Sequence, residues 1–343
     1  MTSRIRVGGW IAAGLCAVLA IGVPATVGIR PFIGARKRAL TNRAFEATPA
    51  RLERGRYLAT SAHPPCILCH SPFEITADGH LQIPDGMAFT GRNWTPDGVP
   101  FVTAPNLTPD AETGIGTWTD DQLARAIREG IGHDGRTLFP VMPYEKLRHL
   151  SDEDLASIVV YLRSLKPVRH PLPKSNVPFP VNYLINSVPE PIDAPVVPDL
   201  STPEKRGEYL VTISACADCH TTRDEQGTVV AGMDFAGGTA LPFGGRKVVY
   251  SANITPSVNG IPYYTEALFI EMMRTGKVRS RALDDMMPTH YFRNMTDQDL
   301  KDIFAFLKTL TPVDHYVDNS LPPTYCPKCK LRHGGGDRNK KGS

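Results

Sequence analysis

The sequence lacks a strong excess of charge of either sign. Its 343 residues contain 38 Lys and Arg against 35 Asp and Glu, which leaves a formal net charge of +3. Such a small excess argues neither for nor against a nucleic-acid or membrane-surface partner. Our prediction is that the protein has no nucleic-acid partner. Proline, with 31 residues, is abundant. It favours long ordered loops and linkers over an all-helical bundle.

Charged residues are absent from Val7 to Ile29, a stretch of 23 residues. A helix of this length crosses the roughly 30 Å hydrocarbon core of a bilayer at 1.5 Å per residue. The alternative is a cleaved signal peptide. However, the apolar run exceeds the usual length of about 7–15 residues, and it ends without a clear small-x-small cleavage site. We therefore expect an uncleaved membrane anchor, and in either case the remaining chain is sent across a membrane.

Cysteine is scarce, and six of the seven cysteines form three Cys-x-x-Cys pairs. Two of the pairs are followed directly by histidine, giving Cys66, Cys69 and His70, and then Cys216, Cys219 and His220. In one helical turn this spacing lets two thiols bond the vinyl groups of a haem while the adjacent imidazole reaches the iron. Two copies in one chain make a disulfide or half a zinc site a poor explanation. The sequence predicts two covalently bound haem c groups.

The flanks of the two motifs also match, which indicates an internal duplication. The matched stretches lie 152 to 145 residues apart and are RGRYL with RGEYL, GMAFTG with GMDFAG, APNLTP with SANITP, VMPY with MMPT, and SDEDLASIVVYLRSL with TDQDLKDIFAFLKTL. We call residues 54–165 the first repeat and residues 206–310 the second repeat. Each is expected to end in a helix that opens with a Ser/Thr-x-x-Asp cap. Gly55 and Gly207 are expected to let the opening helix approach that closing helix, through Tyr161 or Phe306.

An iron that only transfers electrons needs a sixth ligand, and methionine is a frequent choice because its thioether raises the potential. Met87 lies only 17 residues after His70, so Met142 is the predicted ligand in the first repeat. The offset of 145 residues that aligns the closing helices carries Met142 onto Met287 rather than Met286, and both precede proline. The predicted axial pairs are His70 with Met142 and His220 with Met287.

Three histidines could replace these methionines, namely His80, His133 and His290. Bis-histidine ligation would lower the potential markedly. The other methionines are expected to fill the core. They are Met87, Met233, Met272, Met273 and Met295.

With these motifs the chain resembles the class I cytochrome c family in a membrane-anchored dihaem form. It is most similar to the cytochrome c subunits that serve periplasmic quinoprotein and flavoprotein dehydrogenases. The resemblance covers residues 45–315 and includes NLTPDAETGIGTWTDDQLARAIREG, LFPVMPY, NITP and MMPTHYF. It implies that Trp118 packs near the first haem and that Asn106 and Asn253 lie in the loops lining the haem cavities. Those subunits usually carry three haems, whereas this chain has two attachment motifs.

The predicted fold is mostly α, with two tandem class I cytochrome c domains and long loops after one N-terminal transmembrane helix. The expected segments are an anchor and stalk (1–43), haem domain 1 (44–166), a Pro-rich strap (167–203), haem domain 2 (204–316) and a basic tail (317–343). The strap holds ten prolines in 37 residues and is expected to run extended and semi-rigid over the surface. It is also expected to bury its apolar side chains, Phe179, Tyr183, Leu184 and Ile185.

The third cysteine pair, Cys326 and Cys329, has Lys330 where a haem motif needs histidine. A local disulfide is expected in an oxidising compartment. The alternatives are a metal site that also uses His333 and a contact with a partner protein. The surrounding basic run predicts a solvated, disordered tail.

The predicted function is one-electron transfer without catalytic residues. The electrons would come from a quinol enzyme or a periplasmic dehydrogenase and leave to a terminal oxidase or a small soluble carrier. The expected location is the bacterial inner membrane, with a single span and periplasmic haem domains serving a respiratory chain. A dihaem enzyme of the peroxidase or thiosulfate-oxidising type is the alternative, since it would also carry two motifs. It would need an open iron position. A third possibility is an assembly role for the tail cysteines.

Overall fold

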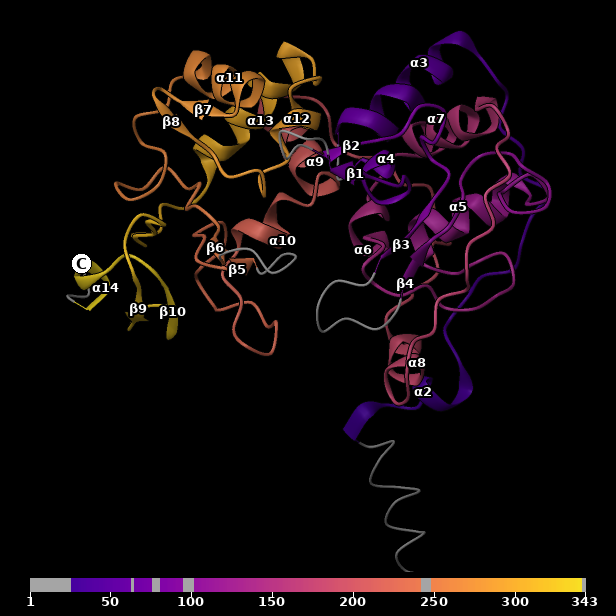
Figure 1. Ribbon diagram of the computed structural model, residues 1–343, viewed down its shortest axis with the longest axis horizontal. Helices are drawn as coiled ribbons and strands as arrows, with labels where there is room; N and C mark the ends of the chain where they lie inside the picture. Colours follow the sequence, from indigo (N-terminus) through magenta and orange to yellow (C-terminus); the bar gives the residue numbers. More distant parts are fainter. Residues whose placement is uncertain (1–25, 63–64, 76–80, 95–101, 242–247, 341–343) are drawn as a thin grey trace, which may run out of the picture. The chain divides into compact units, whose positions relative to one another are not determined.

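The computed structural model describes residues 26–62, 65–75, 81–94, 102–241 and 248–340 (Figure 1). The chain divides into two compact units. The first unit takes its described residues from Met1–Ala44, Trp118–Arg148 and Ser175–Ala194, and the second takes them from Phe45–Thr117, His149–Lys174 and Pro195–Ser343. Most of the predicted anchor lies outside the described residues. Within the described part of the chain, no helix is both long enough and apolar enough to cross a bilayer.

The two repeats form the same elements in the same order, as the internal duplication predicts. The first repeat gives α3 (Pro49–Tyr57), α4 (Cys66–Cys69), the hairpin β3 (Arg92–Trp94) with β4 (Val102–Ala104), α5 (Asp120–Glu129), α6 (Tyr144–Leu147) and α7 (Asp152–Ser164). The second gives α9 (Pro203–Ile213), α10 (Cys216–His220), β5 (Ala240–Leu241) with β6 (Val249–Tyr250), α11 (Glu266–Thr275), α12 (Thr289–Phe292) and α13 (Asp297–Thr309). Helices therefore dominate, and the strands of the described residues form only two-stranded antiparallel sheets.

Smaller elements complete the described chain. They are α2 (Arg30–Ile33), the π-helix η1 (Leu58–Ala62), β1 (Glu74–Ile75) paired with β2 (Leu81–Gln82), α8 (Val181–Leu184), the 3-10 helix η2 (Ile185–Ser187), β7 (Lys277–Val278) paired with β8 (Arg281–Ala282), β9 (Pro323–Cys326) paired with β10 (Leu331–Gly334), and α14 (Asp337–Lys340). In the second unit, α3 packs on α7 and α9 packs on α13 (Figure 1).

Each opening helix approaches its closing helix at the predicted glycine. A Cβ added to Gly55 would lie 1.9 Å from the carbonyl oxygen of Ser157 and 2.7 Å from Cβ of Tyr161. A Cβ added to Gly207 would lie 1.9 Å from the carbonyl oxygen of Asp302. Only glycine fits at either position, so the predicted contact is confirmed in both repeats.

The closing helices begin at the predicted caps. The hydroxyl of Ser151 accepts a hydrogen bond from the backbone amide of Asp154 at 3.0 Å, and the hydroxyl of Thr296 accepts one from the amide of Asp299 at 3.1 Å. Each bond satisfies one of the amides that a helix start leaves without a partner.

A tyrosine from the other repeat completes each of these caps. Tyr209 accepts a hydrogen bond from the N-cap amide of α7 at 3.2 Å and donates one to the Asp154 carboxylate at 2.6 Å. Tyr57 makes the same pair of bonds with the N-cap amide of α13, at 3.2 Å, and with Asp299, at 2.5 Å. Burial and the neighbouring carboxylate raise the pKa of both phenols, so both stay protonated donors. The repeats are therefore joined by a reciprocal exchange of tyrosines.

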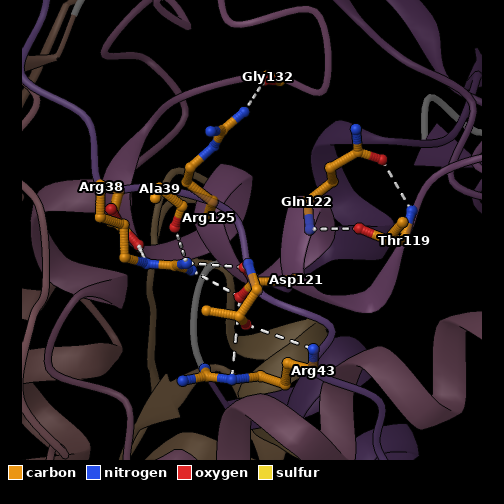
Figure 2. Close-up of polar contacts among 10 residues, drawn as sticks. Arg38, Ala39, Arg43, Thr119, Asp121, Gln122, Arg125 and Gly132 are labelled. Atoms are coloured by element: carbon orange, nitrogen blue, oxygen red, sulfur yellow. Dashed lines mark hydrogen bonds and ion pairs between the residues drawn. The ribbon is translucent and has the colours of Figure 1, made fainter.

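In the first unit, a buried ion cluster fixes the chain that follows α2 to helix α5 (Figure 2). Arg38 donates to both carboxylate oxygens of Asp121, at 2.7 and 2.8 Å, and to Glu129 at 2.8 Å. The amide of Thr41 donates to Asp121 as well. Burial acts to raise the pKa of Asp121, but the hydrogen bonds from Arg38 and Thr41 hold it below its usual value. Asp121 therefore remains a carboxylate although it is fully buried.

The strap differs from the prediction because it contains the short helices α8 and η2, which contact α2. Of its four apolar side chains only Ile185 is buried, whereas Phe179 is 79% exposed. The expectation that all four are covered was therefore wrong. The other three strap side chains and two exposed residues of α2 form what we call the α2–α8 patch. It consists of Phe32, Ile33, Phe179, Tyr183 and Leu184.

The basic tail is folded through residue 340, so the prediction of a disordered tail was wrong for this part. Strands β9 and β10 form an antiparallel hairpin in which Cys326 pairs with Leu331 and Pro323 with Gly334. Helix α14 follows. The side chains of Cys326, Cys329 and His333 are buried, which explains why so short a segment holds a defined fold.

Candidate haem sites

The two Cys-x-x-Cys-His motifs form short helical turns, α4 and α10. All four cysteines are free thiols. Burial, together with the neighbouring thiol, raises the pKa of Cys66 and of Cys216 to about 12, and burial also raises the pKa of Cys69 and Cys219. The thiols are therefore neutral at physiological pH, unlike the low-pKa thiolates of catalytic or redox-sensing cysteines.

The histidine of each motif is held by one backbone carbonyl. Nδ1 of His70 lies 2.8 Å from the carbonyl oxygen of Pro105, and Nδ1 of His220 lies 2.8 Å from that of Ala252. A carbonyl only accepts, so Nδ1 must carry the proton and Nε2 keeps its lone pair. Burial lowers the pKa of His70 to about 4 and lowers that of His220. Both rings thus present a neutral nitrogen, which is the form that binds iron.

The loops that provide these carbonyls are fixed by Asn106 and Asn253. Both are buried, and their amide groups donate at 2.8 Å to the backbone carbonyls of Val168 and Val313, respectively. Each side-chain oxygen accepts a backbone amide two residues later at 2.9 Å. The two asparagines lie in the loops named by the resemblance, and their hydrogen bonds hold the histidine acceptors in place.

Two glycines hold the backbone of the histidines. The amides of Gly91 and Gly237 donate to the carbonyl oxygens of His70 and His220, each at 2.7 Å. Both glycines have positive φ, and a Cβ on Gly237 would lie 2.4 Å from the carbonyl carbon of Ala252. A larger residue would therefore displace the acceptor of the histidine ring.

Sequence reasoning missed the role of two phenylalanines, Phe89 and Phe235. Both adopt the left-handed conformation, with φ of 64° and 55°. Their rings pack edge-on against Tyr161 and Phe306 of the closing helices, at centroid distances of 5.9 and 6.3 Å. The matching stretches GMAFTG and GMDFAG carried the signal. These rings connect the histidine loop of each repeat to its closing helix.

The two sites differ at one position that follows these glycines. In the first repeat it is Arg92, whose guanidinium lies 4.9 Å from the centre of the Phe73 ring and close enough to act electrostatically on Cys69 and His70. In the second repeat it is Gly238, whose amide bonds to Ser251. At this position the first repeat therefore carries a positive charge, where the second repeat has a glycine.

The predicted methionine ligands lie in matching turns. The amide of Met142 donates to Phe139 and its carbonyl accepts from Tyr144, while Met287 bonds in the same pattern to Asp284 and Thr289. Both side chains are partly buried. Met142 belongs to the first unit and His70 to the second, so their pairing stays a prediction.

The alternative histidines are exposed where the structure describes them. His133 stacks on Trp118 at a centroid distance of 4.2 Å, and His290 packs against Tyr291 at the same distance. His80 lies outside the described residues. Of the methionines predicted to fill the core, four are buried as expected, namely Met233, Met272, Met273 and Met295.

One comparison with known proteins matches a family to the second repeat, and another matches individual proteins to a larger part of the chain. The cytochrome c family matches residues 204–311. The fructose dehydrogenase cytochrome subunit of Gluconobacter japonicus is 30% identical over 288 residues, which cover 77% of this chain and 54% of that protein. The gluconate 2-dehydrogenase cytochrome c subunit of Pantoea cypripedii is 27% identical over 288 residues, which cover 78% of this chain and 62% of that protein. A protein named diheme cytochrome c-type from Cereibacter sphaeroides is 30% identical over 201 residues, 56% of this chain and 64% of its own.

Proposed function

Since this chain contains a cytochrome c domain and is similar to cytochrome c subunits of dehydrogenases, we propose that it is a dihaem electron-transfer protein. One observation carries the proposal. Both histidines donate Nδ1–H to the carbonyl at the same place of the repeat, at 2.8 Å in each case. The family match covers only the second motif, and this shared geometry extends the assignment to the first. We propose the haem domains at 44–166 and 204–316, separated by the strap at 167–203.

The residues of each site have separate tasks. Cys66 and Cys69 would bond the first haem, and Cys216 and Cys219 the second. When bound, haem c supplies a ferric–ferrous couple that accepts and releases one electron. The carbonyls behind His70 and His220 orient the rings and increase the basicity of the nitrogen that faces the iron.

Met142 and Met287 are the proposed sixth ligands. Their matching turns and partial burial support them, whereas the two described histidine alternatives point their rings at neighbouring aromatics in exposed positions. With haem bound, a histidine and a methionine at each site would supply both remaining iron ligands. No iron position would then stay open for substrate, which favours electron transfer over a peroxidase or thiosulfate-oxidising activity.

We further propose that the donor is a dehydrogenase or quinol-oxidising enzyme and that the acceptor is an oxidase or a small soluble cytochrome. The similarity to cytochrome subunits of dehydrogenases supports a dehydrogenase partner, although the chain spans only about half the length of the fructose dehydrogenase cytochrome subunit. Contacts between redox partners are commonly small and short-lived.

The proposed location is the periplasmic face of the bacterial inner membrane, with residues 1–43 as anchor and stalk. The α2–α8 patch supports this location because it groups exposed apolar side chains beside the segment that follows the uncharged run. Exposed apolar groups of this kind mark membrane or protein contacts. Sedimentation of the protein with membranes after a high-salt wash tests the anchor. Release by salt would contradict it.

The haem assignment is tested on the purified full-length protein by mass and visible spectroscopy. We expect a polypeptide mass increased by two haems that stay bound after denaturation. A weak far-red charge-transfer band from methionine–ferric haem should fall by about half in Met142→Ala and in Met287→Ala. A high-spin band in the unmodified protein would instead favour the dihaem enzyme, and a single haem would refute the two-site assignment.

A further inference from the structure

The folded tail brings four metal-binding side chains to one point. The ligand atoms of His315, Cys326, Cys329 and His333 all lie within 4.8 Å of one another, and all four residues are buried. The two cysteines are free thiols, so the predicted local disulfide is not present in the structure. We propose that these four residues bind one structural Zn²⁺ ion. This site is separate from both haem motifs and does not depend on the proposed electron transfer.

The hydrogen bonds of the two histidines provide the strongest argument. Nδ1 of His315 lies 2.8 Å from the carbonyl oxygen of Ala236, and Nδ1 of His333 lies 2.9 Å from that of Gly334. Both Nδ1 atoms must therefore donate, and in neutral rings both Nε2 atoms carry lone pairs. These two nitrogens face each other at 2.9 Å in a buried place. Two lone pairs at this distance repel each other unless a proton or a metal ion lies between or beside them, and the two thiols at the same point favour a metal ion.

The second argument is the backbone that carries the thiols. Cys326 ends β9, its carbonyl accepts the amide of Lys330 at 2.8 Å, and Lys330 adopts positive φ. This tight turn directs both thiols of the Cys-x-x-Cys pair to one side of the hairpin. His333 lies two residues after Leu331 on β10, and Leu331 packs against the cluster that contains both cysteines. Three ligands thus come from one hairpin, and His315 comes from the segment after α13.

The donor set matches zinc in type and in size. Two thiolates and two imidazoles in a tetrahedral array are a common structural zinc site, with Zn–S near 2.3 Å and Zn–N near 2.0–2.1 Å. That geometry separates the two nitrogens by about 3.3 Å, so the histidines need to move apart by only a few tenths of an ångström. Two thiolates also balance the charge of the ion, which lets it sit in the apolar shell formed by Val230, Met233, Val313 and Leu331.

The proposed metal site lies beside the histidine loop of the second repeat. A Cβ on Gly238 would lie 2.7 Å from Cε1 of His315, so the glycine makes room for the cluster. The same position of the first repeat is Arg92. The carbonyl that holds His315 belongs to Ala236, whose neighbour Gly237 holds the backbone of His220. We infer that the metal holds the tail against the histidine loop of the second repeat. At the corresponding position the first repeat has the guanidinium of Arg92 instead.

Elemental analysis of the full-length protein, purified without chelators, tests the site directly. We expect one zinc per polypeptide, whatever its iron content. Zinc K-edge absorption, which iron does not obscure, should show two sulfur neighbours near 2.3 Å and two nitrogen neighbours near 2.05 Å. A zinc shell of oxygen neighbours would overturn the proposal. So would a zinc-free protein whose tail cysteines resist alkylation under denaturing conditions, because that result indicates a disulfide.

Variants separate the site from the haems. Cys326→Ser and His315→Asn should each reduce bound zinc at least tenfold while both haems remain attached. Cys16→Ser removes the one cysteine that belongs to none of the three Cys-x-x-Cys pairs, and we expect it to keep the full zinc content. Equal zinc in Cys326→Ser and Cys16→Ser would refute the assignment. If Cys326→Ser fails to fold, the absorption spectrum of the unmodified protein still decides it.

Discussion

The exchange of tyrosines between the repeats can be tested by removing one hydroxyl at a time. In Tyr209→Phe the N-cap amide of α7 loses its acceptor and Asp154 loses one donor, although Arg54 still binds that carboxylate at 2.7 and 2.8 Å. A buried polar group left without a partner costs about 1–3 kcal/mol. Tyr209 is only 7% exposed, so we expect a loss of about 2 kcal/mol. Tyr57→Phe should cost less, about 1 kcal/mol, because its partner Asp299 is only partly buried.

Thermal unfolding followed by circular dichroism measures both effects. For a unit of this size, 2 kcal/mol corresponds to a midpoint lower by about 4–8 °C. Tyr183→Phe, which removes the hydroxyl of an exposed tyrosine, is the matched control and should leave the midpoint unchanged. In a double-mutant cycle, Tyr209→Phe and Asp154→Asn should be non-additive by about 1 kcal/mol. Additive effects, or a midpoint that Tyr209→Phe does not shift, would refute the cross-repeat cap.

Three further predictions follow from the packing, the ion cluster and the axial ligands. Gly207→Ala should cost about 3 kcal/mol or more by urea unfolding, because its Cβ overlaps the backbone of α13, whereas the exposed Glu208→Ala on the same helix should be nearly neutral. Asp121→Asn should cost about 3 kcal/mol of local stability and speed proteolysis of residues 26–44. Since the pKa of Asp121 is lowered on folding, its contribution is present above pH ~4 and lost as the pH falls further, so proteolysis of the unmodified protein should also accelerate there. Met142→His and Met287→His should each lower one midpoint of a redox titration by on the order of 100 mV, and two unchanged midpoints would contradict the assigned ligands.

Local patterns in the sequence were sufficient for much of the fold. The Ser/Thr-x-x-Asp caps predicted where α7 and α13 begin, because a cap bonds to an amide of its own first turn. The glycines of α3 and α9 were also predicted, since matched positions in two repeats imply the same packing. The prediction failed for the strap, where composition gives no information about which apolar side chains find a covering surface.

The tail shows why spacing alone could not decide its chemistry. Cys326 and Cys329 are close enough for a disulfide or for two metal bonds, and the sequence offers the same spacing for both. The deciding residue is His315, which lies 11 residues before Cys326 and reaches the thiols only after β9 and β10 fold back onto the second repeat. No local pattern marks it.

The sequence by itself predicts the attachment chemistry and shows the duplication, because Cys-x-x-Cys-His acts within one helical turn and repeated stretches can be aligned directly. Tertiary structure alone decided which carbonyl orients each histidine, that Tyr57 and Tyr209 cap helices of the opposite repeat, and that His315 meets the tail thiols. These contacts join residues that are far apart in the chain. Their distances depend on how helices and loops pack, which residue order does not state.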